Sequence, residues 1–360
     1  MSAKWVILGL VALVVLSMLD RVPNEPVAFA DSHLESAVRN ALGVVDRPLF
    51  TEDLLRLTEL SAVGRGIASL DGLAACANLV HLDLGENHVS DLAALAGLRH
   101  LEVLGLRSNR VSDVSPLAGS VSLCKLDLDF NFITDVRPLA GLIGLRWLGL
   151  WNSGIRDVSP LAGLAELTEL GLSGNPIEDF SPLAELTKLV WLGLPNTGIE
   201  DLSPLAGLTD LVKLSLGGNR IVDLSPLSRL VHLQRLGLDS NEIVDVSALA
   251  GLVELRQLSL WGNRIEDVAA LGGMTKIEAL WLDGNPVSDI ASLARMTELH
   301  VVGLSETNVS DLSPLLANPG LGAGDEVDVT DARLDPSDGS AARRAVEELM
   351  RRGVAVRGAS

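Results

Sequence analysis

The chain of 360 residues is strongly acidic, with a formal net charge of −19, and 48% of its residues are hydrophobic although only 3% are aromatic. This acidity argues against a nucleic-acid partner, because phosphate recognition needs a basic surface. Two cysteines, Cys76 and Cys124, are too few for a disulfide framework, and the sequence has no Cys or His spacing typical of a metal site. The composition predicts an aliphatic core and no metal or other cofactor.

Residues 1–30 are typical of a secretory signal peptide. Lys4 precedes the apolar run Trp5–Leu19, and Ala28–Ala30 has the small-x-small pattern of a cleavage site before Asp31. The apolar run is shorter than the about 20 residues that span a bilayer. The long interval between the run and the cleavage site leaves an uncleaved membrane anchor as the alternative. Either way, we expect a secreted or cell-envelope protein.

Residues 31–56 are predicted to form a helical N-terminal cap. Ser32 and Glu35 have the spacing of a capping box, and Gly43 is a stop signal for the helix that follows them. Thr51 is predicted to start a second short helix. Such a cap would cover the apolar end of whatever structure follows.

Residues 57–320 contain an internal repeat. One 22-residue unit recurs eleven times over Leu79–Gly320 without insertion or deletion, after a degenerate copy at Leu57–Asn78. Each unit reads L-x-x-L-x-L-x-x-N-x-I-x-D-x-x-x-L. A fixed period of this size predicts a solenoid in which each coil packs only on its neighbours.

The repeat resembles the leucine-rich repeat, in the 22-residue form found in internalin-type bacterial proteins. The resemblance implies an α/β leucine-rich repeat solenoid with short parallel strands on its concave face and short 3-10 or irregular turns on its convex face. Helical caps would close both ends. The unit that carries the resemblance most clearly has Leu123, Leu126, Leu128, Asn131, Ile133, Asp135, Pro138 and Leu139.

Two polar columns recur with the repeat, and both are interpreted as structural. An asparagine at the ninth position of most units is predicted to bond buried backbone groups. An aspartate at the thirteenth position is predicted to cap the turn that follows it. Calcium binding is the alternative for the aspartates, but single carboxylates one coil apart lack the clustered oxygens that calcium requires.

Residues 321–360 are predicted to be a C-terminal cap. Val327–Val329 could form a last strand, and Ser337–Arg352 has the periodicity of an amphipathic helix that ends at Gly353. Val354–Val356 could add an edge strand.

The candidate ligand-binding residues lie at the third, fifth, seventh and eighth positions of the repeat, which should face the concave side. The tryptophans beyond the leader all occupy these positions, and none occupies a core position. They are predicted to form two clusters beside a shallow trough that glycines leave at the fifth position, and three cations on the same face are candidates as well. The candidate residues are Trp147, Trp151, Trp191, Trp261, Trp281, Arg107, Lys213 and Arg235.

No common catalytic motif is present, so we expect a binding protein and not an enzyme. The leading hypothesis is a secreted or cell-surface protein whose Trp-rich concave face recognises a protein or peptide. The alternatives are a carbohydrate-binding protein, because sugars also stack on tryptophan, and a structural envelope protein. An intracellular scaffold similar to phosphatase regulators is disfavoured by the leader. We expect no nucleic-acid partner, and a membrane only through an uncleaved N-terminal segment.

Overall fold

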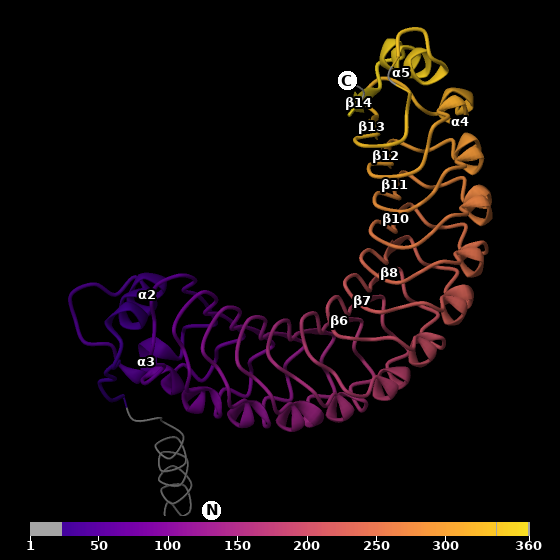
Figure 1. Ribbon diagram of the computed structural model, residues 1–360. Helices are drawn as coiled ribbons and strands as arrows, with labels where there is room; N and C mark the ends of the chain where they lie inside the picture. Colours follow the sequence, from indigo (N-terminus) through magenta and orange to yellow (C-terminus); the bar gives the residue numbers. More distant parts are fainter. Residues whose placement is uncertain (1–23, 336, 359–360) are drawn as a thin grey trace, which may run out of the picture.

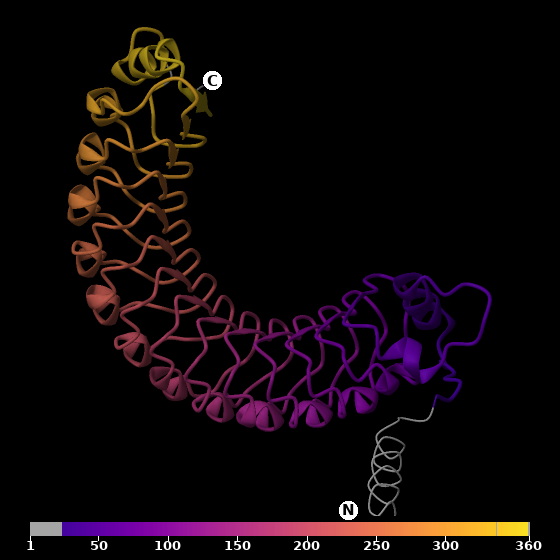
Figure 2. The same ribbon diagram turned by 180° about the vertical axis from the view of Figure 1, so that it is seen from behind.

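The computed structural model describes residues 24–335 and 337–358, which form one curved solenoid (Figure 1). Short strands line the inside of the arc and short helical turns line its outside, as the view from behind also shows (Figure 2). All the strands belong to one parallel sheet, in which neighbours in sequence are neighbours in space from β1 to β14. The predicted leucine-rich repeat solenoid is confirmed. The apolar run 5–19 lies outside the described residues.

Each coil contributes one three-residue strand to the concave face and one short helix to the convex face. The strands are β1 (Glu59–Ser61), β2 (His81–Asp83), β3 (Val103–Gly105), β4 (Lys125–Asp127), β5 (Trp147–Gly149), β6 (Glu169–Gly171), β7 (Trp191–Gly193), β8 (Lys213–Ser215), β9 (Arg235–Gly237), β10 (Gln257–Ser259), β11 (Ala279–Trp281), β12 (Val301–Gly303), β13 (Glu326–Asp328) and β14 (Ala355–Arg357). The 3-10 helices are η1 (Leu73–Ala75), η2 (Ala93–Leu95), η3 (Ser115–Leu117), η4 (Arg137–Gly141), η5 (Ser159–Leu161), η6 (Ser181–Glu185), η7 (Ser203–Leu205), η8 (Ser225–Arg229), η9 (Ser247–Leu249), η10 (Ala269–Gly273) and η11 (Ala291–Arg295). The α-helices are α2 (Ser32–Leu42), α3 (Thr51–Leu54), α4 (Ser313–Ala317) and α5 (Ala341–Arg351).

The constant repeat length fixes the register of the sheet. Lys125 in β4 pairs with Trp147 in β5, and Trp147 pairs in turn with Glu169 in β6, each 22 residues further on. The middle residue of each repeat strand is a buried aliphatic, so its two neighbours point to the concave side. Residues at the same repeat position therefore form continuous columns across the concave face.

The aspartate column lies on the outer edge and caps the helical turns, as predicted. In η3, the backbone N–H of Ser115 donates to the carboxylate of Asp113 (2.8 Å), and the Ser115 hydroxyl donates to its other oxygen (3.0 Å). These hydrogen bonds hold the pKa of Asp113 below its ordinary value. No group of three His, Cys, Asp or Glu side chains in the described residues is arranged to hold a metal ion.

The asparagine column is buried and joins each coil to the one before it. The Asn219 side-chain amide donates to the carbonyl of Leu194 in the preceding coil (2.9 Å) and to that of Leu216 in its own coil (2.7 Å). Its oxygen accepts the backbone N–H groups of Thr197 (3.0 Å) and Gly198 (2.9 Å). The column is structural, as the sequence indicates, because these backbone groups would otherwise be buried without partners.

The N-terminal cap differs from the prediction at its first turn. Asp31, and not a Ser32–Glu35 capping box, caps α2, since its carboxylate accepts the backbone N–H of His33 (2.9 Å). The other carboxylate oxygen accepts the N–H of Ala68 (2.8 Å), so this side chain also ties the cap to the first coil. The helix ends at Gly43 with φ of 68°, as predicted. Helix α3 starts at Thr51, also as predicted.

Residues 24–30, which the sequence analysis assigned to the leader, are packed into this cap. The backbone N–H of Val27 donates to Leu49 (2.8 Å), and that of Thr51 donates to Glu25 (3.0 Å). Phe29 is buried in the apolar core against Gly72, where a Cβ would lie 2.8 Å from the phenyl ring. The segment therefore contributes main-chain and side-chain contacts to the folded domain.

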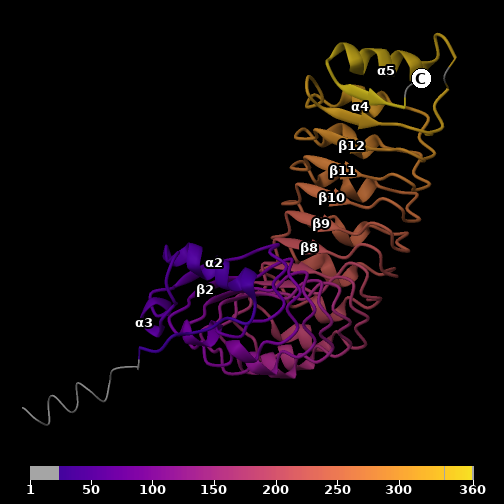
Figure 3. The same ribbon diagram turned by 90° about the vertical axis from the view of Figure 1, so that its left-hand side faces the viewer.

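At the other end, α5 covers the last coils (Figure 3). Ser340 caps this helix, which begins slightly later than predicted, and its apolar face is buried as expected. Strands β13 and β14 lie within one residue of the predicted ones. Cys76 and Cys124 are both free, and burial raises the pKa of the Cys76 thiol to about 12. None of the helices in the described part of the chain has the length and apolar character needed to cross a bilayer.

Replacing Asn219 with Ala should lower the free energy of unfolding by about 3 kcal/mol or more, because several buried backbone groups lose their partners together. Urea denaturation would measure the loss. The exposed Asp210 provides the control, since Asp210→Ala should change stability by about 0.5 kcal/mol or less. Equal stability of the two variants would contradict a structural role for the asparagine column.

Candidate ligand-binding site on the concave face

The tryptophans of the described chain all lie on the concave side. Trp147 in β5 and Trp191 in β7 occupy the third position, Trp281 in β11 occupies the fifth, and Trp151 and Trp261 follow β5 and β10 at the seventh. Trp261 is 45% exposed and the others are half-buried. None belongs to the core, which is aliphatic along the repeats.

Trp151 and Trp191 form one aromatic unit across three strands. Their ring centroids are 6.2 Å apart and their planes are inclined by 42°, within the range of favourable aromatic pairs. Strand β6 runs between them, and contact is possible because its fifth-position residue is Gly171. A Cβ at this position would lie 2.0 Å from Trp151 Nε1. The glycine therefore lets the indole lie over the neighbouring coil.

The predicted glycine trough is not open. The Trp147 ring folds over Gly149, where a Cβ would lie 2.6 Å from Cη2. The Asp83 carboxylate similarly covers Gly105, at 2.7 Å from the corresponding Cβ position. The expectation of a trough beside the tryptophans was wrong, because flat side chains pack down onto backbone that has no Cβ. The result is a surface of indole rings packed on the sheet. Trp147, Trp151 and Trp191 form this surface, which we call the aromatic platform.

Trp147 is held from the side opposite Trp191. The ammonium of Lys125 in β4 lies over the Trp147 ring, 4.9 Å from its centroid, which is a cation–π distance. The rings of Trp261 and Trp281 make no stacking contact, within the described residues, although the Leu260 N–H donates to the Trp281 carbonyl (2.9 Å). The structure thus pairs two members of the first predicted cluster directly and leaves the second as two separate rings.

Phe130 is a member of this surface that the sequence analysis missed. It is 39% exposed, and the Arg107 guanidinium lies 4.9 Å from its ring centroid. Its φ is 56°, because the eighth position adopts the left-handed conformation throughout the repeats. A bulky residue is unfavourable there. A phenylalanine in a column otherwise filled by Gly, Asn, Ser and Glu is the signal that could have revealed it.

Lys213 and Arg235 are exposed neighbours on β8 and β9. They are paired in register at the third position, and Lys213 is in turn the register partner of Trp191. Neither cation makes an ion pair with any of the described residues. Arg107, in contrast, pairs with Asp129 at 3.5 Å.

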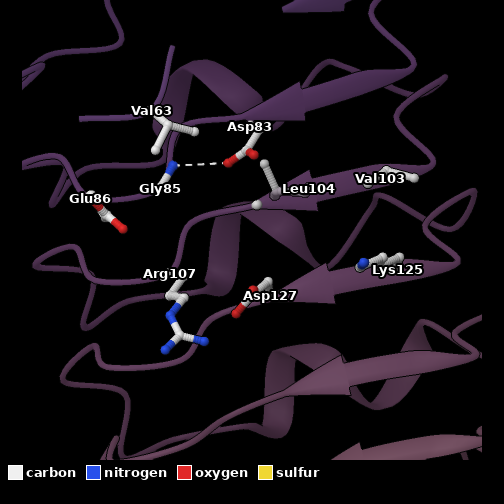
Figure 4. Close-up of a pocket in the computed structure, with 10 residues that line it drawn as sticks. Val63, Asp83, Gly85, Glu86, Val103, Leu104, Arg107, Lys125 and Asp127 are labelled. Atoms are coloured by element: carbon white, nitrogen blue, oxygen red, sulfur yellow. Dashed lines mark hydrogen bonds between the residues drawn. The ribbon is translucent and has the colours of Figure 1, made fainter. Parts of the chain in front are cut away.

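An open pocket of about 290 Å³ lies on the concave face over β2, β3 and β4 (Figure 4). Gly105 and the carboxylates of Asp83 and Asp127 are among its lining residues. Arg107 and Lys125 complete its wall. Because Arg107 and Lys125 also contact Phe130 and Trp147, the pocket adjoins the aromatic platform.

Asp129 is a buried carboxylate beneath this surface. Its oxygen accepts the backbone N–H of Trp151 (2.8 Å), which fixes the chain that carries the indole. Burial raises the pKa of Asp129 to about 6, an effect opposed by this hydrogen bond and by Arg107 and reinforced by Asp127. The backbone of Trp151 is therefore hydrogen-bonded to a carboxylate whose pKa is about 6.

The comparisons with known proteins agree with this architecture. Family descriptions read "Leucine Rich repeats (2 copies)" for residues 187–229 and "Leucine Rich repeat" for residues 75–96. No curated protein matches the chain by sequence. An internalin (InlF) from Listeria monocytogenes has a solved structure that is 30% identical, with a TM-score of 0.74 over 83% of this chain and 97% of that one.

Two further structures share the fold at lower identity. A leucine-rich repeat protein from Leptospira interrogans is 18% identical, with a TM-score of 0.70 over 81% of each chain. The plant peptide hormone receptor RGFR1, solved in complex with RGF2, is 19% identical, with a TM-score of 0.58 over 79% of this chain and 55% of that one.

The fold and the repeat define a leucine-rich repeat protein, a class that generally mediates protein–protein recognition and typically serves as a non-enzymatic binding scaffold. Within this class, the chain belongs to the internalin-type family. The 22-residue repeat and the similarity to the Listeria internalin show this membership.

Replacing Asp129 with Asn should remove a contribution to stability that grows as the pH falls from 7 to 4. The folded-state pKa of about 6 is above the ordinary value, so the folded protein binds a proton that the unfolded chain does not bind between about pH 6 and 4. Wild-type stability should therefore gain on the order of 2 kcal/mol relative to Asp129→Asn as the pH falls from 7 to 4. Urea denaturation at both pH values measures this gain.

The control is Asp113→Asn. Because the pKa of Asp113 is lowered, its contribution to stability is present above its ordinary pKa and is lost as the pH falls from that value through the lowered folded-state pKa. This variant should follow the wild type between pH 7 and 4. Parallel curves for wild type and Asp129→Asn would refute the assignment.

Proposed function

We propose that this protein is exported and binds a protein or peptide on its concave face, with Trp151 and Trp191 as the central anchor. The observation that carries the proposal is their direct ring contact over Gly171. The core is complete without these indoles, so packing does not account for them. Half-buried aromatic groups already held in place bury large areas at little entropic cost, which is typical of interface anchors.

The charged residues around the platform support a protein ligand. Lys125 and Arg107 lie beside aromatic rings, and Asp83 and Asp127 line the adjoining pocket. A surface with both signs of charge beside an aromatic centre suits a partner that also carries both signs. The relatives of this fold include a receptor solved with a bound partner, which agrees with this use of the scaffold.

A carbohydrate ligand is the second candidate. The specific observation that favours it is Trp261, whose indole is 45% exposed and makes no stacking contact within the described residues. An exposed indole face is also a surface on which a sugar ring stacks. Screening the protein on a glycan array separates the two candidates, because a protein-binding surface should retain no glycan after washing.

Replacing Trp147, Trp151 and Trp191 together with Ala should weaken the capture of protein partners at least tenfold. An aromatic anchor is worth about 2 kcal/mol or more at an interface. The melting temperature should fall by only a few degrees, because the rings lie outside the core. Affinity capture with the immobilised protein, followed by binding titration of each captured partner, measures the effect.

Gly171→Ala is the matched variant for this experiment. It keeps every tryptophan, but its Cβ would occupy the position of Trp151 Nε1 and force the ring away from Trp191. Binding should weaken and the tryptophan fluorescence should change. Unchanged binding by both variants would disprove the aromatic anchor, whereas unfolding of the triple variant would show that the rings are core.

For export, we propose that any leader is removed upstream of Asn24 and not before Asp31. Cleavage before Asp31 would release Phe29 from the core and remove the main-chain hydrogen bonds of Glu25 and Val27. Cleavage would also break the peptide bond that joins Ala30 to Asp31, the residue that caps α2.

A chain that starts at Asp31 should be less stable than one that starts at Asn24. Loss of the buried phenyl ring alone accounts for about 3 kcal/mol. Thermal melting of the two purified chains tests the difference, with Phe29→Ala in the longer chain as the control that isolates the ring. An exported protein whose mass corresponds to an Asp31 terminus, and which melts like the longer chain, would refute this proposal.

A further inference from the structure

Two unpaired cations lie side by side on the concave face of a protein whose net charge is −19. Lys213 and Arg235 are both exposed, occupy adjacent strands in register, and have no ion-pair partner in the described part of the chain. Exposed arginines elsewhere on the solenoid commonly pair with a glutamate one coil away, as Arg156 does with Glu178 (2.9 Å). Like charges directly opposite each other on a sheet are destabilising. The pair therefore has no structural benefit.

We propose that Lys213 and Arg235 bind an acidic side chain of the protein ligand, next to an apolar group that the ligand places on Trp191. This inference rests on the proposed concave-face function and specifies the chemistry that it recognises. Adjacent strands are about 4.8 Å apart, so a single carboxylate can contact both cations. Trp191 is one strand from Lys213 and two strands from Arg235.

The side chains around Lys213 and Arg235 leave room for a carboxylate of the ligand. At the fifth position, the strands that carry the two cations have Ser215 and Gly237. Neither residue has a large side chain that would fill the space beside the cations. The nearest acidic groups on the face are directed elsewhere. Glu169 lies on the far side of Trp191. The Asp239 carboxylate packs against Gly217, 2.4 Å from the corresponding Cβ position, and its other oxygen lies 3.6 Å from the Cβ position at Gly237, without an ion pair to Arg235 among the described residues.

The distribution of charge favours a protein segment over an acidic polysaccharide. A polyanion carries charge along its whole length, and on this face it would also meet Glu169, Asp83 and Asp127. A protein segment can present one carboxylate to the cation pair and place neutral or basic groups on the remaining coils. Charge complementarity is then local, which fits a strongly acidic binding protein.

The test uses a phage-displayed random peptide library selected on the wild-type protein and on Lys213→Glu/Arg235→Glu. Wild type should enrich peptides in which Asp or Glu lies close to an aromatic or large aliphatic residue. The variant should lose this enrichment, and synthetic peptides from the wild-type selection should bind it at least tenfold more weakly. Their binding to wild type should also weaken when NaCl is raised, because the contact is exposed.

The control is Arg229→Glu/Arg295→Glu, which changes the net charge equally on the convex turns η8 and η11. It should select the same peptides as wild type. Circular dichroism verifies that both variants fold. Lys213→Gln/Arg235→Gln repeats the test without added negative charge, and it should also lose the acidic preference.

The outcomes separate this inference from the proposed function. Peptides that depend on Trp151 and Trp191 but show no acidic preference would overturn the cation-pair assignment alone. Peptides that bind equally well without those tryptophans would overturn the proposed function. Tighter binding of polygalacturonate fragments than of any selected peptide would overturn the choice of a protein segment.

Discussion

The fixed spacing of the buried asparagine column is the constraint on which the rest of the structure depends. In each coil that has the asparagine, its amide group reaches a carbonyl 25 residues earlier in the chain. Its oxygen in turn accepts N–H groups that lie 20 to 22 residues earlier. One inserted residue would separate these partners and leave buried polar groups unsatisfied. The coils are therefore locked to one length, which keeps every concave column in register.

Because the strands are in register, each repeat position corresponds to one place on the concave face. Because the core positions are committed to aliphatic packing, chemical variation is confined to the few positions that face the concave side. The Trp151–Trp191 contact illustrates this: it needs a tryptophan at the seventh position, a glycine at the fifth position of the next coil and a tryptophan at the third position of the coil after that. Three coils build one feature, although each coil packs only on its neighbours.

The same logic explains what could be predicted from the sequence. The solenoid, the strand positions and the column that carries each tryptophan follow from the period alone. The direction of each ring does not, because it depends on the absence of a Cβ in a neighbouring coil, as at Gly171. Asp31 was missed as the helix cap because Asp31 and Ser32 are both favourable N-cap residues and the spacing of Ser32 to Glu35 favoured the serine. Its second bond, to Ala68, cannot be predicted from local spacing. Phe130 occupies the eighth position, which was predicted to face the concave side, but only tryptophans and cations were selected there as candidates.

Charged residues have different roles on the convex edge and on the concave face, and the net charge of the protein does not reveal this difference. The aspartates of the convex edge are bound to backbone N–H and serine hydroxyl groups, so much of the acidity belongs to the architecture of the turns. Charges on the concave face have no such repeat-wide role. Lys125 and Arg107 lie over aromatic rings, and Asp129 is buried. Lys213 and Arg235 have no ion-pair partner among the described residues. In a solenoid that pairs its polar groups by repetition, the exposed cations that depart from the repetition and have no partner among the described residues are the ones that we propose contact a ligand.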